Sequence, residues 1–232
     1  MKIACWSGPR NLSTAMMYAF AARGDCAVWD EPFYAAYLSR SGSDHPMRDA
    51  ILASQPADPA AVVSGLLGGQ MRKPYSYFKL LTHHMLAGFP LDWAEDCVNV
   101  HLIRHPARVI ASYAKKRAAP TLEDIGLPQQ LALLDQLGGI VVDGDDIRRD
   151  PARALKRLCD AMGFGFSPAM LAWPEGPKPF DGVWASHWYD AVHRSTGFAG
   201  PEGPLPELTG QAQALCDAAM PLYRALSDRV LT

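Results

Sequence analysis

The sequence predicts an α/β fold in which a central, mainly parallel sheet is covered by helices on both faces. Short apolar runs alternate with segments of helical character along the whole chain, as in proteins built from strand–helix–strand units. The apolar runs are continuous and rich in β-branched and aromatic residues, which is typical of strands buried on both faces of a parallel sheet. Together these patterns predict three layers: helices, sheet, helices.

The first strand–loop–helix unit begins at the amino terminus. Residues 3–6 form an apolar run that predicts a short buried strand. The run breaks at Ser7–Asn11, and residues 12–23 then predict a helix that Gly24 ends. Further strands are predicted at 26–29, 75–81, 98–103 and 140–142.

Helices between these strands are predicted from caps, proline positions and apolar stripes. Asp58-Pro59 and Asp150-Pro151 each place an N-cap residue before a proline at the first helical position. Segment 164–206 is rich in glycine, proline and tryptophan and is predicted to be irregular, as functional loops often are. The predicted helices lie around 36–38, from Met47, and over 58–67, 106–117, 128–137, 152–162 and 206–226.

Size, charge and cysteine usage narrow the class of protein. The 232 residues fit one domain, 1–232, and the formal net charge of −2 argues against a general nucleic-acid binder. No apolar run approaches the roughly 20 residues that cross a bilayer, and no secretory signal is predicted. The five cysteines form no C-x-x-C pair, which predicts free thiols in a reducing cytoplasm rather than disulfides or a metal site.

The loop at residues 7–14 has the features of an oxyanion-binding loop. A helix that begins directly after a glycine-containing loop points backbone N–H groups and the positive end of its dipole at one place. Arg10 adds a positive charge, and Ser13 and Thr14 add hydroxyl donors. The loop lacks the second glycine and the lysine of a Walker A motif. The alternative is an ordinary strand–helix turn capped by Asn11.

Polar side chains follow the predicted strands where each strand ends. Because right-handed crossovers place all strand-to-helix loops at one edge of a parallel sheet, these side chains are expected to form one site. The residues concerned are those of the loop 7–14, Asp30, Glu31, His83, His84, Arg104, His105 and Asp143.

Four stretches, in order and at matching spacing over nearly the whole chain, resemble the sulfotransferase family that uses 3′-phosphoadenosine 5′-phosphosulfate (PAPS). WSGPRNLST resembles the family's 5′-phosphosulfate loop, and HLIRHPARVIASY resembles its 3′-phosphate segment. IVVDGDDIRRDPARALKRLCDAMGF resembles the strand and helix that follow, and HRSTGF resembles the late loop that closes over the 3′-phosphate. The resemblance implies the P-loop-type sulfotransferase fold, with PAPS as donor and 3′-phosphoadenosine 5′-phosphate (PAP) as product.

The resemblance also implies a set of donor-binding residues. The 5′-phosphosulfate would be held by Ser7, Gly8, Pro9, Arg10, Asn11, Leu12, Ser13 and Thr14. The 3′-phosphate would be held by Arg104, Ser112, Arg194, Ser195, Thr196 and Gly197. Two separate cationic clusters suit a donor that is phosphorylated at two positions.

The proton acceptor is open between two side chains. In cytosolic members of the family the catalytic histidine follows Lys-Thr on the third strand, and here His83 follows Leu81-Thr82. Other branches place a glutamate after the second strand, where this chain has Glu31. Arg10 stands in a loop that carries a lysine in cytosolic members. Because arginine does not readily give up its proton, Arg10 would stabilise the leaving oxygen by its charge.

Each of these assignments has a structural alternative. Arg104 could pair with Asp143 or Glu31 at the sheet edge, and Ser112 could face solvent or bond to its own helix. The pair 83–84 is expected to contain at least one structural histidine.

The resemblance implies a small-molecule acceptor with a hydroxyl or an amine, no metal, and neither a nucleic-acid nor a membrane partner; a homo-oligomer is compatible with the sequence. Two other functions stay open. One is a kinase that uses ATP and Mg²⁺, which the missing Walker residues disfavour. The other is a nucleotide-binding protein of the same fold that does not catalyse transfer.

Overall fold

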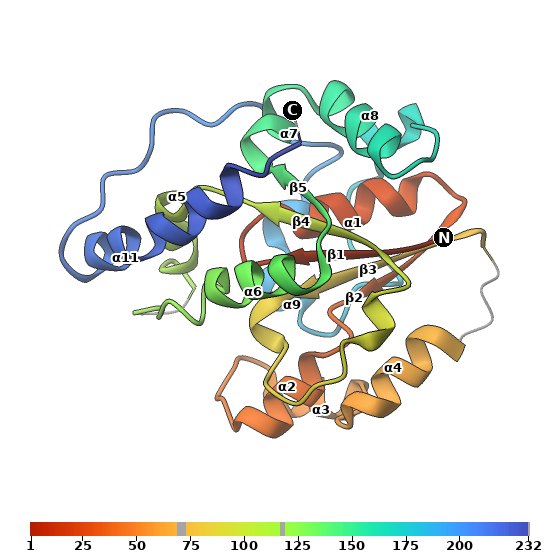
Figure 1. Ribbon diagram of the computed structural model, residues 1–232, viewed down its shortest axis with the longest axis horizontal. Helices are drawn as coiled ribbons and strands as arrows, with labels where there is room; N and C mark the ends of the chain where they lie inside the picture. Colours follow the sequence, from red (N-terminus) through yellow and green to blue (C-terminus); the bar gives the residue numbers. More distant parts are fainter. Residues whose placement is uncertain (69–72, 117–118, 232) are drawn as a thin grey trace.

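The structure, a computed structural model, describes residues 1–68, 73–116 and 119–231 and confirms the predicted α/β architecture (Figure 1). One sheet has the strand order β2–β3–β1–β4–β5, and each neighbouring pair is parallel. The predicted strands are confirmed, with ends that differ by at most one residue. They are β1 (Lys2–Ser7), β2 (Cys26–Asp30), β3 (Tyr75–Leu81), β4 (Val98–Ile103) and β5 (Ile140–Asp143).

The strand order determines where a ligand can bind. From the central strand β1 the chain moves out to β2, returns through β3, and then crosses to β4 on the other side of β1. Ser7 at the end of β1 lies opposite Leu81 of β3 and Leu102 of β4. Open α/β sheets bind ligands outside the carboxyl ends of the strands, where the direction of the strand order reverses. Here that place is the set of loops after β1, β3 and β4.

Helices cover both faces of the sheet, and the sequence pattern of β1 explains why (Figure 1). Ile3 and Cys5 point to one face, which packs against α1 (Ser13–Ala22) and α8 (Pro151–Ala161). Ala4 and Trp6 point to the other face. That face packs against α2 (Tyr34–Ser41), α4 (Pro59–Gly68) and α6 (Leu127–Leu137). The remaining longer helices are α3 (Arg48–Ser54), α5 (Pro106–Tyr113) and α11 (Gly210–Ser227).

Several helix boundaries differ from the prediction. Helix α5 ends at Tyr113 instead of residue 117, and residues 117–118 lie outside the described residues. Helix α11 begins at Gly210 instead of residue 206, because Thr209 is still extended. The unpredicted α7 (Gly144–Arg149) directly follows β5, and the Asp143 side chain caps it by accepting a bond from the N–H of Asp145 at 2.8 Å.

The described chain also contains short helical turns. Two of them, α9 (Ala185–Trp188) and α10 (Asp190–His193), fall in the segment 164–206. The others are 3₁₀ turns, η1 (Thr82–His84), η2 (Asp92–Ala94) and η3 (Pro168–Leu171). Among the described helices none is long and apolar enough to cross a membrane.

Candidate functional site

A cavity of about 320 Å³ lies at the carboxyl edge of the sheet. Its walls come from the loop after β1, the ends of β2 and β3, helix α5 and the segment around 188–199. Most of the predicted site residues line it: Pro9, Arg10, Asn11, Leu12, Ser13, Thr14, Glu31, His83, Arg104, Ser112, Ser195 and Gly197. In the described parts of the chain, Ser7, Gly8, Arg194 and Thr196 are not among the lining residues.

The loop after β1 turns sharply at the entrance to α1. A Cβ at Gly8 would lie 2.2 Å from the carbonyl oxygen of Ile125, so glycine is required where the loop leaves the strand. Arg10 and Leu12 have φ angles of 63° and 64°, in the left-handed region that residues with a Cβ rarely adopt. A backbone of this kind can turn several N–H groups toward one anion.

The Asn11 side chain anchors this loop rather than capping the helix. Its Nδ2 donates to the carbonyl oxygen of Leu102 on β4 at 3.2 Å. The residue before α1 is Leu12, which makes no side-chain capping bond. The alternative of a turn capped by Asn11 is therefore wrong.

Arg10, Arg104 and Ser112 form a connected donor cluster at one end of the cavity. The Arg10 Nε donates to the Ser112 Oγ at 3.0 Å, and an Arg104 Nη1 donates to the Arg10 carbonyl oxygen at 2.7 Å. Burial, followed by the charge of Arg104, lowers the pKa of Arg10. Two guanidinium groups so close together favour an anion between or beside them.

In the structure an acidic side chain, Glu202, is bonded to Arg104 of this cationic cluster, although Glu202 is not among the residues that line the cavity. Both carboxylate oxygens of Glu202 accept bonds from Arg104. Arg108 Nε lies 3.4 Å from Glu202 Oε2, and Arg148 Nη1 lies 3.4 Å from Oε1. Burial disfavours the Glu202 carboxylate, but its bond to Arg104 and the three arginine charges hold its pKa below the ordinary value. The alternative prediction, that Arg104 pairs with Asp143 or with Glu31, is therefore wrong.

The segment that carries Glu202 is also bound through its backbone. Arg108 donates to the carbonyl oxygen of Gly203 at 2.7 Å, and Arg148 donates to that of Gly200 at 2.9 Å. Asp143 lies outside the cavity lining and accepts a bond from the Tyr223 hydroxyl at 2.7 Å. It belongs to the cap of α7 and the packing of α11.

The opposite end of the cavity contains a buried ionic group. The Lys79 Nζ lies 2.8 Å from Asp30 Oδ1, 2.5 Å from Glu31 Oε1 and 2.6 Å from the Tyr189 hydroxyl. Burial raises the pKa of Glu31 to about 6, although Lys79 opposes the rise. The two carboxylates raise the pKa of Lys79 despite its burial. A carboxyl group that titrates near neutral pH is suited to acid–base chemistry.

Histidines and aromatic rings complete this end. His83 and His84 are buried in η1, and the His84 ring stacks on Tyr34 at 4.4 Å between centroids. Among the described residues neither ring nitrogen of His84 has a hydrogen-bond partner. Burial, followed by the charge of His83, lowers the pKa of His84 well below its ordinary value. His84 is thus held neutral.

The sequence did not assign several residues to this site. Arg108 and Arg148 lie on helices whose pattern gave no sign of a shared ligand, and Glu202 lies in a segment without regular structure. Lys79 stands within an apolar strand, which is itself an unusual place for a charge. Tyr189 had no local signal. Within residues 1–68, 73–116 and 119–231 no group of three or more His, Cys, Asp or Glu side chains is arranged to hold a metal ion.

Comparisons with known proteins bear on the family and on the fold. A family model described as "Sulfotransferase domain" matches residues 1–230. The branched-chain-amino-acid aminotransferase-like proteins 1 and 2 of Arabidopsis thaliana are 37% and 35% identical to the chain over 230 and 229 residues. These matches cover 97% of this chain but 41% of each relative, so the chain spans about two fifths of their length.

The fold also resembles a solved structure. The sulfotransferase domain from the curacin biosynthetic pathway has a TM-score of 0.59 and 16% sequence identity, covering 94% of this chain and 96% of that one. At this identity the likeness concerns the fold.

Proposed function

Because the chain belongs to the sulfotransferase domain family, we propose that it transfers a sulfuryl group from PAPS to a hydroxyl or an amine of a small molecule and releases PAP. One observation carries the proposal. A single cavity has arginines beside a helix N-terminus at one end and Glu31 with His83 at the other. The same cavity thus contains both an anion site and a candidate proton acceptor, the two parts that sulfuryl transfer requires.

The donor would be held by the loop after β1 and by the adjoining Arg104 and Ser112, which Arg10 connects to the loop. The loop 8–14 and Arg10 would bind the 5′-phosphosulfate, because backbone N–H groups, the helix dipole and a guanidinium all favour an anion there. Arg104 and Ser112 would bind the 3′-phosphate, with Ser195 and Gly197 beside them. The 3′-phosphate would then take the place that Glu202 occupies in the structure.

Transfer would proceed by in-line displacement at sulfur. The acceptor oxygen or nitrogen forms a bond to sulfur while the bond from sulfur to the bridging oxygen breaks, and PAP leaves with that electron pair. Arg10 would stabilise the charge on the leaving oxygen. Glu31 or His83 would take the proton of the acceptor, a contribution of roughly 10²–10⁴-fold in rate.

Ligand-dependent thermal unfolding is the first test. A ligand present at about 100 times its Kd stabilises the folded protein by about 2.7 kcal/mol, which for a chain of this size raises Tm by about 5–10 °C. We expect this rise with PAP and with PAPS, and its loss in Arg104→Ala. Arg153→Ala is the control, since Arg153 lies on the exposed side of α8.

The outcomes separate the candidate functions. A rise only with ATP and Mg²⁺ contradicts the proposal and favours a kinase. If PAP binds, a panel of alcohols, phenols and amines with PAPS follows, with sulfated products detected by mass spectrometry. Binding without any transfer would identify a nucleotide-binding protein that is not a sulfotransferase.

A further inference from the structure

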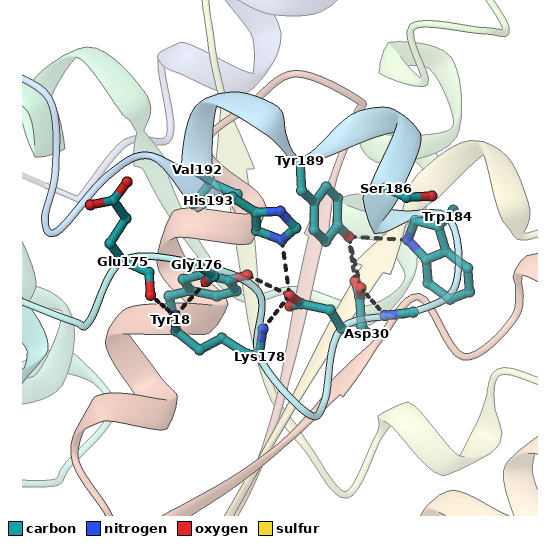
Figure 2. A network of polar contacts seen from close by, with 12 residues as sticks. Tyr18, Asp30, Glu175, Gly176, Lys178, Trp184, Ser186, Tyr189, Val192 and His193 are labelled. Atoms are coloured by element: carbon teal, nitrogen blue, oxygen red, sulfur yellow. Dashed lines mark hydrogen bonds and ion pairs between the residues drawn. The ribbon is translucent and has the colours of Figure 1, made fainter.

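Four polar side chains from three parts of the chain meet at the acid–base end of the cavity. Asp30 ends β2, Glu31 follows it, Lys79 lies in β3 and Tyr189 stands between α9 and α10. The Tyr189 hydroxyl lies 2.7 and 2.8 Å from the two carboxylate oxygens of Asp30. Trp184 Nε1 donates to the same hydroxyl at 3.1 Å, as Figure 2 shows.

Burying this charged group in the protein interior is unfavourable for stability. Lys79 is 1% exposed, Glu31 5% and Asp30 7%. Removing three charges from water carries a large desolvation cost, and apolar residues at such places are often more stable. One cation also faces two carboxylates, so the group carries an excess negative charge unless it binds a proton. A function explains this arrangement better than stability does.

The Glu31 carboxylate is held from one side. Its hydrogen bonds in the described residues are all made by Oε1, to Lys79 and, at 3.4 Å, to Tyr189. The backbone is fixed as well, since the Glu31 N–H donates to the Lys79 carbonyl oxygen at 2.9 Å and Gln55 donates to the Glu31 carbonyl oxygen at 3.2 Å. Glu31 has a left-handed φ of 41°, a strained conformation that such contacts must maintain.

We propose that Lys79, Asp30 and Tyr189 are positioning residues that hold Glu31 as the base of the reaction. The inference rests on the proposed function and selects between its two candidate bases. Glu31 Oε2 takes the proton from the acceptor hydroxyl while the acceptor oxygen bonds to sulfur and PAP leaves. Lys79 and Tyr189 stay bonded to Oε1 throughout and fix the direction of Oε2.

The neighbours of Glu31 act on its charge in opposite directions. Lys79 and the Tyr189 hydroxyl favour the ionised carboxylate, whereas burial and the charge of Asp30 favour the protonated form. Other titratable or charged groups that share the cavity wall with Glu31 in the described residues are Arg10, Tyr34, His45, His83, His84, Arg104, Tyr113 and Arg148.

The test measures the titration of Glu31 itself, by NMR of the carboxyl carbons in ¹³C-labelled full-length protein. Lys79→Met is expected to move the midpoint upward by about 1 pH unit or more, because an opposite charge at hydrogen-bond distance is lost. Tyr189→Phe moves it upward by less, and Asp30→Asn moves it downward. Lys156→Met and Tyr223→Phe are matched controls, because both side chains make polar contacts outside the cavity lining.

The signs distinguish positioning from a structural role. If these residues only supported the fold, each substitution would admit water and lower the Glu31 midpoint toward its ordinary value, and such a uniform shift overturns the inference. Should Lys79→Met fail to fold, the opposite signs of Tyr189→Phe and Asp30→Asn carry the test.

The titration needs neither donor nor acceptor, so it stands apart from the proposed function. With an acceptor from the panel, the acidic limb of the kcat/KM profile should move with the Glu31 midpoint in each variant. If transfer occurs but the acidic limb of its kcat/KM profile does not move with the Glu31 midpoint, Glu31 is not the base. The expected titrations without transfer from PAPS to any acceptor support the positioning group and contradict the proposed function.

Discussion

At the scale of single residues, the site contains residues whose backbone conformation or burial is energetically unfavourable when considered alone. Arg10 adopts a left-handed backbone, Glu31 is buried with a raised pKa, and the ring nitrogens of His84 are buried without a hydrogen-bond partner among the described residues. The local sequence gives the residue types but does not predict their backbone conformation, burial or hydrogen bonding. Arg104 and Glu31 could be predicted to lie at the site because each follows a strand, whereas their partners could not.

His84 leads to a prediction about stability and pH. Its pKa in the folded protein lies well below its value in the unfolded chain, so the stabilisation is complete above about pH 6.5 and is lost as the pH falls. Below that pH one additional proton binds on unfolding, which reduces the free energy of unfolding by about 1.4 kcal/mol per pH unit. His84→Gln removes this contribution. Urea unfolding of both proteins between about pH 6 and pH 5 measures the difference, and parallel curves would contradict the prediction.

At the scale of elements, the sequence predicts the strands and the first loop but not the contacts between distant elements. The five strands and the loop 7–14 follow from local apolar patterns and caps, and they were predicted with nearly correct ends. The pairing of Arg104 with Glu202 spans 98 positions and that of Lys79 with Tyr189 spans 110. Such contacts are decided by the packing of distant elements, for which a single sequence has no periodic signal. Helix α7 was missed because Asp143 both ends a strand and caps a helix.

The segment that carries Glu202 gives a prediction of its own. If the 3′-phosphate must displace the Glu202 carboxylate from Arg104, Glu202→Gln should bind PAP more tightly. A charge-assisted bond contributes about 1.5–3 kcal/mol, so an increase in affinity of about tenfold or more is expected.

Calorimetry of PAP binding measures this change. Glu207→Gln is the control, since Glu207 is an exposed residue of the same segment. Weaker binding in Glu202→Gln would show instead that Glu202 orders the arginines for a phosphate that binds beside it.

At the scale of the whole molecule, segments distant in sequence meet at one edge of the sheet. The cavity joins the loop after β1, the end of α5 and the segment around 188–199. The meeting of the loops that follow the strands was predictable, because parallel strands with right-handed crossovers place these loops at one edge of the sheet. The contribution of the late segment was implied by resemblance alone, since its irregular sequence predicts no position in space.

Hydrogen exchange should record this convergence. Binding of PAP is expected to slow amide exchange in residues 7–14, 104–112 and 195–204 together, because one ligand orders all three. Helix α4, which packs on the other face of the sheet, serves as the internal reference. Protection confined to residues 7–14 would mean that the nucleotide is held only by its 5′ end.

The two arginines of the cationic end are bonded crosswise. Arg104, which follows β4, holds the backbone of Arg10, while the Arg10 guanidinium holds Ser112 on the helix after β4. Neither group can move without disturbing the other, so in the proposed complex the contacts at the two ends of the nucleotide are expected to be thermodynamically coupled. Substitutions at Arg10 and Ser112 will therefore not have additive effects on binding. Under the proposed function, a nucleotide with only one of the two phosphates is expected to lose more affinity than the missing contacts alone contribute, which would favour the doubly phosphorylated donor over singly phosphorylated nucleotides.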